Sequence, residues 1–239
     1  MGRLPEKESL VDIFRWRVKE SSESIVSKYK DRLLTYKEYD SNANKVAQGI
    51  INEGCKPNGR VAFLAKNSDQ FFEFLYGTMK SRTVAVGINW RLAPPEVSYV
   101  INDSKSEILF VGKEFYPIIR EIINEIPTIK KIISMDGESE WEHYIFWRDK
   151  FEAIDPFLES NIEDDVIQLY TSGTTGYPKG VQLTNKNFIK SNLMVEKTWG
   201  KDWHEGSANI ICSPVFHVAG ANMGVMGIVF GCKNIIIPE

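Results

Sequence analysis

Residues 170–180 read Tyr170-Thr171-Ser172-Gly173-Thr174-Thr175-Gly176-Tyr177-Pro178-Lys179-Gly180. Glycines allow the backbone to turn its N–H groups toward an anion, and the Ser and Thr hydroxyls add uncharged donors. Lys179 supplies one full positive charge. This combination predicts a loop that holds a polyphosphate.

The segments on both sides of this loop are predicted to be strands. Residues 165–170 and 181–183 are apolar runs, so the loop should join two strands. A Walker A loop instead has Gly-Lys-Ser/Thr at the start of a helix, whose N–H groups bind the phosphate. Here Lys179 follows Pro178 and precedes Gly180, without the Ser/Thr that usually binds magnesium. We therefore expect Lys179 to act as a tethered point charge, and residues 171–179 to be the most mobile internal segment without nucleotide.

The remainder of the chain alternates between helical and strand patterns. Ser9 with Asp12, and Thr35 with Glu38, have the spacing of capping boxes, and Gly54 should end the second helix. Further strands are predicted at residues 60–65, 83–88, 107–111, 130–135, 209–212 and 234–237, and helices at 69–80, 94–102, 115–126 and 185–199. This alternation predicts an α/β fold with a mostly parallel sheet flanked by helices. Residues 1–135 form its α/β layer, and 136–164 are a connector.

Composition excludes several classes of protein. The 239 residues include 29 basic and 32 acidic side chains, a net charge of −3 without a long basic tract, which argues against a nucleic-acid surface. The basic cluster at residues 28–32 is interpreted as solvated turns. Cys55, Cys212 and Cys232 lack Cys-x-x-Cys spacing, so neither disulfides nor a zinc site is indicated, and no metal-ligating residue is predicted. A cytoplasmic location is expected.

Residues 215–232 are almost entirely apolar and approach the length of a membrane span. Pro214, His217 and Asn222 lie at the start of this run, and no basic cluster flanks it. We therefore predict a buried glycine-rich helix and no transmembrane segment.

The loop at 170–180 resembles the phosphate-binding signature of the adenylate-forming ligases, which include acyl-CoA synthetases, adenylation domains of peptide synthetases and luciferases. Two further stretches resemble the same family in order and spacing. They are Asn89-Trp90-Arg91-Leu92-Ala93-Pro94-Pro95-Glu96 and Ser213-Pro214-Val215-Phe216-His217-Val218-Ala219-Gly220. The sequences of these stretches most resemble those of bacterial fatty-acyl and aryl-acyl CoA synthetases.

The resemblance implies ATP, Mg²⁺ and coenzyme A as cofactors of the full-length enzyme, and a small carboxylic acid as its substrate. Lys179 and His217 are the implied catalytic residues. Asn89 and Arg91 either form a structural turn or help to frame the nucleotide cleft. The implied phosphate group is Thr171, Ser172, Gly173, Thr174, Thr175, Gly176 and Lys179, and the implied acyl pocket is His217, Val218, Ala219, Gly220 and Met223.

The resemblance also implies that residues 1–239 are a truncated N-terminal AMP-binding domain, with 165–239 carrying the phosphate loop and part of the acyl pocket. The family's adenine, ribose and C-terminal motifs do not occur in the sequence. We expect this piece to be inactive by itself and to self-associate through an uncovered apolar edge near Ile235, Ile236 and Ile237. Two alternatives remain open, an amino-acid adenylation domain and a non-catalytic binding module.

Overall fold

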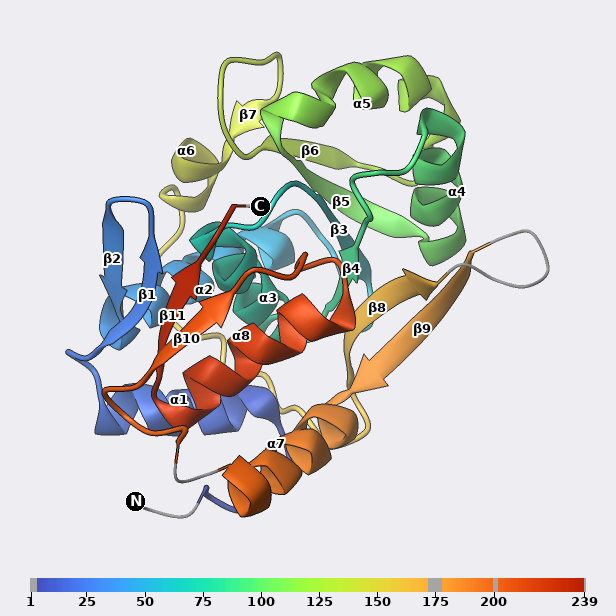
Figure 1. The fold of residues 1–239 in the computed structure, drawn as a ribbon. Coiled ribbons are helices and arrows are strands. Elements are labelled where there is room, and N and C mark those ends of the chain that lie inside the picture. The colour runs from blue at the N-terminus through green and yellow to red at the C-terminus, as the bar shows by residue number, and fades with distance from the viewer. Residues whose placement is uncertain (1–3, 172–177, 200–201, 239) are drawn as a thin grey trace.

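The computed structural model describes residues 4–171, 178–199 and 202–238 (Figure 1). Within these ranges the strands form two sheets, one of seven strands and one of four. The larger sheet has the order β7-β6-β5-β3-β4-β8-β9, and β9 alone runs antiparallel to its neighbour. Its strands are β3 (Arg60–Leu64), β4 (Val84–Gly87), β5 (Ser106–Val111), β6 (Lys131–Ser134), β7 (Glu142–His143), β8 (Asp165–Thr171) and β9 (Lys179–Thr184). The prediction of a mostly parallel sheet is confirmed.

Helices cover both faces of the larger sheet. Helices α4 (Pro94–Ser104) and α5 (Tyr116–Ile122) pack on one face, where residues such as Leu64 and Val86 are fully buried. Two short 3₁₀ turns, Lys113–Phe115 and Ile123–Glu125, flank α5. The predicted helix at 115–126 is therefore shorter than expected. Pro117 lies in the first turn of α5, where its missing N–H costs no hydrogen bond.

The other face is covered by α1 (Leu10–Glu20), α2 (Tyr36–Asn52) and α3 (Asp69–Lys80). Both predicted caps are present. The Ser9 hydroxyl accepts from Asp12 N, and Thr35 and Glu38 form a complete capping box. Gly54, with φ of 83°, follows the end of α2, where the left-handed conformation favours glycine. The connector adds one short helix, α6 (Tyr144–Arg148), beside α2.

The second sheet was not predicted as a separate unit. Its order is β10-β11-β1-β2, from β1 (Ile25–Tyr29), β2 (Arg32–Thr35), β10 (Ala208–Ile211) and β11 (Lys233–Ile236). The predicted solvated turn at residues 28–32 is present at Lys30 and Asp31, but the prediction missed that it closes a β-hairpin between β1 and β2. Ser27 is buried and pairs with Asn234, a partner too distant along the chain for any local pattern to reveal.

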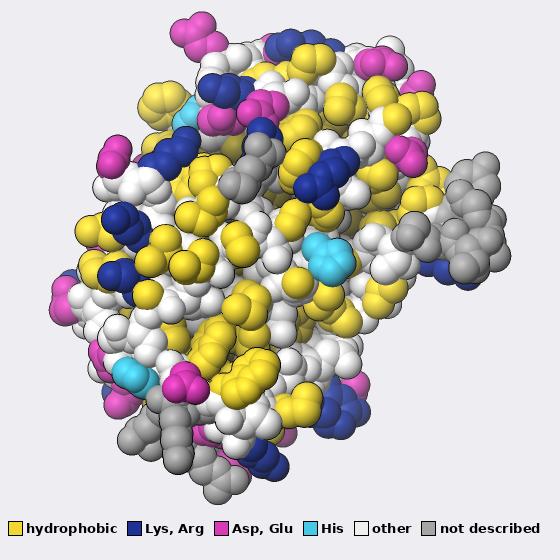
Figure 2. All heavy atoms as spheres, viewed as in Figure 1, with side chains coloured by type: hydrophobic (Ala, Val, Ile, Leu, Met, Phe, Trp, Pro, Cys, Tyr) yellow, Lys and Arg dark blue, Asp and Glu magenta, His cyan; other side chains and the backbone are white. Residues whose placement is uncertain are grey.

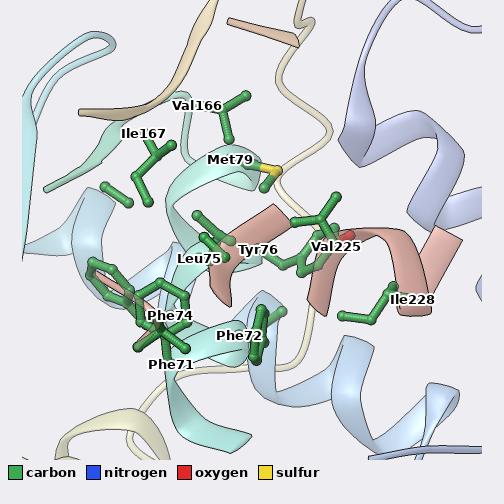
Figure 3. Packing of buried hydrophobic residues seen from close by; sticks show 14 of the residues in the cluster. Phe71, Phe72, Phe74, Leu75, Tyr76, Met79, Val166, Ile167, Val225 and Ile228 are labelled. Atoms are coloured by element: carbon green, nitrogen blue, oxygen red, sulfur yellow. The ribbon is translucent and has the colours of Figure 1, made fainter. Parts of the chain in front are cut away.

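Helix α8 (Val218–Phe230) packs on one side against β10 and β11 of the smaller sheet and on the other against α1 and α3 of the larger one. It also contacts α7 (Asn185–Trp199) (Figure 1). Figure 3 shows side chains of α3, β8 and α8 meeting in one apolar cluster, including Phe72, Val225 and Ile228. The run at 215–232 therefore contains the predicted glycine-rich helix, which is buried from Gly220 to Phe230 apart from the half-buried Asn222 and Met223, whereas its start is exposed. Among the helices in the described ranges, none has the length and hydropathy needed to cross a bilayer.

The expected apolar edge at Ile235–Ile237 is not formed. Strand β11 is paired on both sides, with β10 through Ile235↔Ile210 and with β1 through Ile235↔Lys28. The outer strand is β10, where Ile210 is 58% exposed. The reason is the hairpin, because β1 occupies the side of β11 that the sequence pattern left open.

Candidate functional site

The predicted phosphate loop joins β8 to β9, as the sequence indicated. In the antiparallel ladder Thr171 lies directly opposite Lys179, and both side chains are exposed. The predicted ligands Ser172, Gly173, Thr174, Thr175 and Gly176 lie outside the described residues, as does most of the segment predicted to be mobile. The register nevertheless pairs Thr171 with Lys179 across the ladder at the base of the loop, which puts their side chains on the same face of the sheet.

A polar anchor fixes the strands beneath this loop. The Tyr170 hydroxyl donates to Asp103 on α4 at 2.6 Å and accepts from Gln168 Nε2 at 2.9 Å. Burial and the Asp103 carboxylate raise the pKa of Tyr170, so it stays a neutral donor. Opposite it, a Cβ on Gly180 would lie 2.5 Å from Gln168 Nε2. A side chain at position 180 would therefore displace the Gln168 amide that donates to Tyr170.

The segment after β4 lies next to this loop because β4 pairs with β8, Gly87 facing Leu169. Asn89 Oδ1 accepts from Arg91 N at 3.0 Å and so closes a tight turn. The Arg91 guanidinium stacks over the Trp90 ring, 4.4 Å from its centroid. These contacts account for Asn89 and Arg91 as a structural turn, and they leave the Arg91 side chain exposed at the carboxyl end of the strands.

His217 caps α8 at its N-terminus. Its Nδ1 accepts from Ala219 N at 3.3 Å, and its backbone N donates to Pro214 O at 3.1 Å. With Nδ1 as acceptor, the neutral ring carries its proton on Nε2. The imidazole is exposed, so Nε2–H is available as a donor to a ligand.

The other predicted pocket residues lie on the first turns of α8. Val218 and Ala219 are exposed beside His217, and Met223 is half-buried. Gly220 is buried, and a Cβ there would lie 2.3 Å from Pro214 O, so no other residue fits. On the face viewed in Figure 2, hydrophobic side chains gather over α8. An apolar acyl chain has suitable contact surface here.

Phe216 connects the two halves of the site. Its ring packs edge-on against Trp90 at 6.1 Å, and its Cα would lie 3.1 Å from a Cβ on Gly87. The segment that carries His217 therefore rests on the end of β4, the neighbour of β8. Sequence reasoning missed this packing and the buried hydrogen bonds of Asn67, which lies in the loop after β3, three residues beyond Leu64. Its position at a strand's carboxyl end was the available signal, since ligands of α/β sheets bind there.

A separate cavity of about 740 Å³ opens beside the carboxyl ends of β3, β5 and β6. It is lined by Asn67 but by neither Lys179 nor His217. Its buried carboxylates already have partners, since Asp69 pairs with Arg32 at 2.6 Å and Glu73 with Arg148 at 3.1 Å. This cavity therefore does not coincide with the predicted site, which is defined by the side chains of Lys179 and His217.

Metal ligands are not gathered in the described part of the chain, where no three His, Cys, Asp or Glu side chains could hold an ion together. Residues 4–171, 178–199 and 202–238 therefore supply no Mg²⁺ site of this kind.

Comparison with known proteins identifies a family that matches almost the whole chain. Residues 14–239 match the family described as AMP-binding enzyme. The chain is 35% identical over 225 residues to the fatty acid–[acyl-carrier-protein] ligase ScoC of Streptomyces coeruleorubidus, covering 92% of this chain and 42% of that protein. It is 31% identical over 223 residues to the long-chain-fatty-acid–CoA ligase FadD13 of Mycobacterium tuberculosis, covering 91% and 42%. The chain thus spans less than half the length of these two relatives.

Solved structures agree with the fold. The inhibitor-bound N-terminal domain of FACL13 from Mycobacterium tuberculosis superposes with a TM-score of 0.89 at 28% identity, covering 98% of this chain and 58% of that one. The anthranilate CoA ligase AuaEII, in complex with anthranoyl-AMP, gives a TM-score of 0.89 at 25% identity, covering 99% and 46%.

Proposed function

The chain belongs to the AMP-binding enzyme family, and from this premise we propose that it is the N-terminal part of an ATP-dependent acid–thiol ligase. The substrate class is a fatty or aryl carboxylic acid. The observation that carries the proposal is the register of Thr171 opposite Lys179, which sets a hydroxyl and an ammonium at the base of a Gly/Ser/Thr-rich loop.

In the first step a carboxylate oxygen attacks the α-phosphorus of ATP. The bond from that phosphorus to the bridging oxygen breaks, leaving acyl adenylate and pyrophosphate. Charge grows on the leaving pyrophosphate, so donors directed at the β- and γ-phosphates stabilise the transition state. Lys179, Thr171 and the hydroxyls and N–H groups of 172–176 supply those donors. Mg²⁺ accompanies ATP as part of the substrate.

His217 and the start of α8 receive the acid. A carboxylic acid is ionised at neutral pH, so the histidine need not act as a base. Its Nε2–H can donate to a carboxylate oxygen and orient it. Val218, Ala219 and Met223, on the same turns of the helix, offer apolar surface to the acyl group, while Gly220 lets the helix start against the Pro214 carbonyl.

In the second step a thiol sulfur attacks the carbonyl carbon of the adenylate, the bond to the phosphate oxygen breaks, and AMP leaves as the thiol loses its proton. Coenzyme A is the first candidate acceptor. A second is the phosphopantetheine thiol of an acyl carrier protein, favoured by the name of the 35% identical relative. The names of these relatives favour acid–thiol ligation over an amino-acid adenylation domain or a non-catalytic module.

We further propose that residues 1–239 do not turn over by themselves. Thr171, Lys179 and the loop between them are proposed to hold the phosphates alone, whereas adenylation also needs adenine and ribose held. Holding all parts makes attack effectively intramolecular, a contribution of about 7–11 kcal/mol when complete. A cytoplasmic location and fatty acid metabolism as its setting belong to the same proposal. So does self-association of the isolated piece, for which the outer strand β10 with the exposed Ile210, and not the paired strand β11, offers an apolar edge.

The test is ATP–pyrophosphate exchange by the full-length protein with a panel of fatty, aryl and amino acids. Exchange that depends on a fatty or aryl acid is the expected result. Exchange with amino acids only would assign the alternative, and no exchange with any acid would overturn the proposal. Release of acyl-CoA, compared with loading of a carrier protein, separates the two acceptors.

A further inference from the structure

The side chain of Asn67 ties together the carboxyl ends of the two sheets. It lies in the loop after β3 and is 3% exposed. Its Nδ2 donates to Ser213 O at 3.1 Å and to Ile237 O at 3.2 Å, and its Oδ1 accepts from Val215 N at 2.9 Å. One amide of the larger sheet therefore binds the segments that leave β10 and β11 in the smaller sheet.

These three bonds need a carboxamide. The site offers two carbonyl acceptors and one N–H donor, and an Asn side chain presents two N–H donors and one carbonyl in a rigid plane. An aspartate would keep the acceptor for Val215 N but direct an anionic oxygen at two carbonyls. Val215 is 1% exposed, so water cannot readily replace a lost partner there.

The segment held by Asn67 carries His217. Val215 N donates to the Asn67 side chain, and His217 N donates to Pro214 O. The backbone that carries the His217 imidazole is therefore held by hydrogen bonds. On its other side the segment rests on Trp90 through Phe216. Of these two supports, the Asn67 amide is the one that is directional.

We propose that Asn67 is a positioning residue for the acid-binding end of the site. It acts through residues 213–217 and touches neither nucleotide nor acid. The inference rests on the proposed function, in which His217 orients the carboxylate. Loosening this segment should weaken productive binding of the acid while leaving the phosphate loop on β8 and β9 unaffected.

Asn185 provides a matched control. It is also 3% exposed, accepts from Leu10 N at 2.9 Å and donates to Asn161 O at 2.8 Å and Ser160 Oγ at 3.3 Å. It follows β9 at the end of the sheet opposite the phosphate loop, since Thr184 pairs with Asp165, the first residue of β8. Asn185→Asp therefore removes the same kind of amide from the same depth of burial, away from the site.

The first experiment compares pyrophosphate exchange by the full-length parent, Asn67→Asp and Asn185→Asp. We expect Asn67→Asp to raise the KM for the acid about tenfold, the size expected for a lost buried hydrogen bond, with the KM for ATP within about twofold of the parent. Asn185→Asp should leave both constants near the parent values. Equal shifts in both variants, or an unchanged KM for the acid in Asn67→Asp, would overturn the inference.

A second measurement needs no activity. Hydrogen–deuterium exchange should be faster in residues 213–221 of Asn67→Asp and unchanged there in Asn185→Asp. Asn67→Ser, which introduces no charge, replaces Asn67→Asp should that variant fail to fold. If the parent protein shows no acid-dependent pyrophosphate exchange, the proposed function is overturned. If deuterium uptake in residues 213–221 of the Asn67 variant equals that of the parent, the role of Asn67 itself is overturned.

Discussion

Gly224 of α8 lies against the ring of Phe72 of α3, and a Cβ added to the glycine would stand 2.0 Å from Phe72 Cζ. This approach brings the helix of the smaller sheet onto the helical layer of the larger one (Figure 3). Because α3 is buried against the larger sheet, this contact fixes α8 relative to the strands that carry the phosphate loop.

Gly224→Ala should lower the stability of the protein. Helix propensity alone would favour alanine by about 1 kcal/mol, but overpacking a buried contact costs about 1–3 kcal/mol or more. We expect a net loss, read from thermal or urea unfolding. Adding Phe72→Leu should make the alanine less costly than in the parent background. A stability equal to or above that of the parent for Gly224→Ala would contradict this packing.

The buried ion cluster at Asp155 should make stability depend on pH. Asp155 pairs with Arg15 at 2.7 Å and with the fully buried Lys80, which also pairs with Asp40 at 2.9 Å. Burial by itself raises the pKa of Asp155, but Arg15 and Lys80 outweigh it and lower the pKa. A depressed pKa gives stability that is present above the unfolded value, about 3.9, and is lost as pH falls toward the folded value.

Asp155→Asn should therefore destabilise the protein by up to about 3–5 kcal/mol at pH 7, because it removes the carboxylate that Arg15 and the buried Lys80 share and leaves them only Asp12 and Asp40 as anionic partners. The difference from the parent should shrink as the pH falls below about 4. Glu140→Gln is the control, since Glu140 pairs with Arg120 on the surface and should contribute little. A difference between parent and Asp155→Asn that stays constant from pH 7 to pH 3 would rule out this linkage.

Thiol labelling tests the burial pattern. Burial and Glu107 raise the pKa of Cys55 to about 12, and burial raises the pKa of Cys232 to about 11. Cys212 is exposed. Because the thiolate is the reactive form, iodoacetamide at pH 8 should modify Cys212 in the folded protein and all three thiols after denaturation. Rapid native labelling of Cys55 or Cys232, mapped by mass spectrometry, would show that their segments are packed otherwise.

Local signals predicted much of this fold. Helix Asp69–Lys80 has its predicted limits, and the caps at Ser9 and Thr35 are formed, because capping and helical spacing act over a few residues. The arrangement of two strands, β8 and β9, on either side of the loop was likewise predicted from adjacent residues.

Pairing between residues far apart in the chain could not be predicted from the sequence. Residues 28–32 show a polar surface pattern, and the second sheet depends on pairings between distant strands, such as that of Ser27 with Asn234. The same holds for Asn67, whose partners Ser213, Val215 and Ile237 lie far along the chain. Such contacts depend on tertiary packing, which overrides local preference.

Lys179 tests the central claim most directly. Its ammonium is exposed at the base of the loop, opposite Thr171, so Lys179→Ala should leave the unfolding temperature near that of the parent. Pyrophosphate exchange by the full-length protein should fall about 10²–10³-fold, because charge stabilisation of the leaving pyrophosphate is lost. Lys190→Ala, another exposed lysine, should keep the parent rate. Acid-dependent exchange in Lys179→Ala equal to that of the parent would contradict the account.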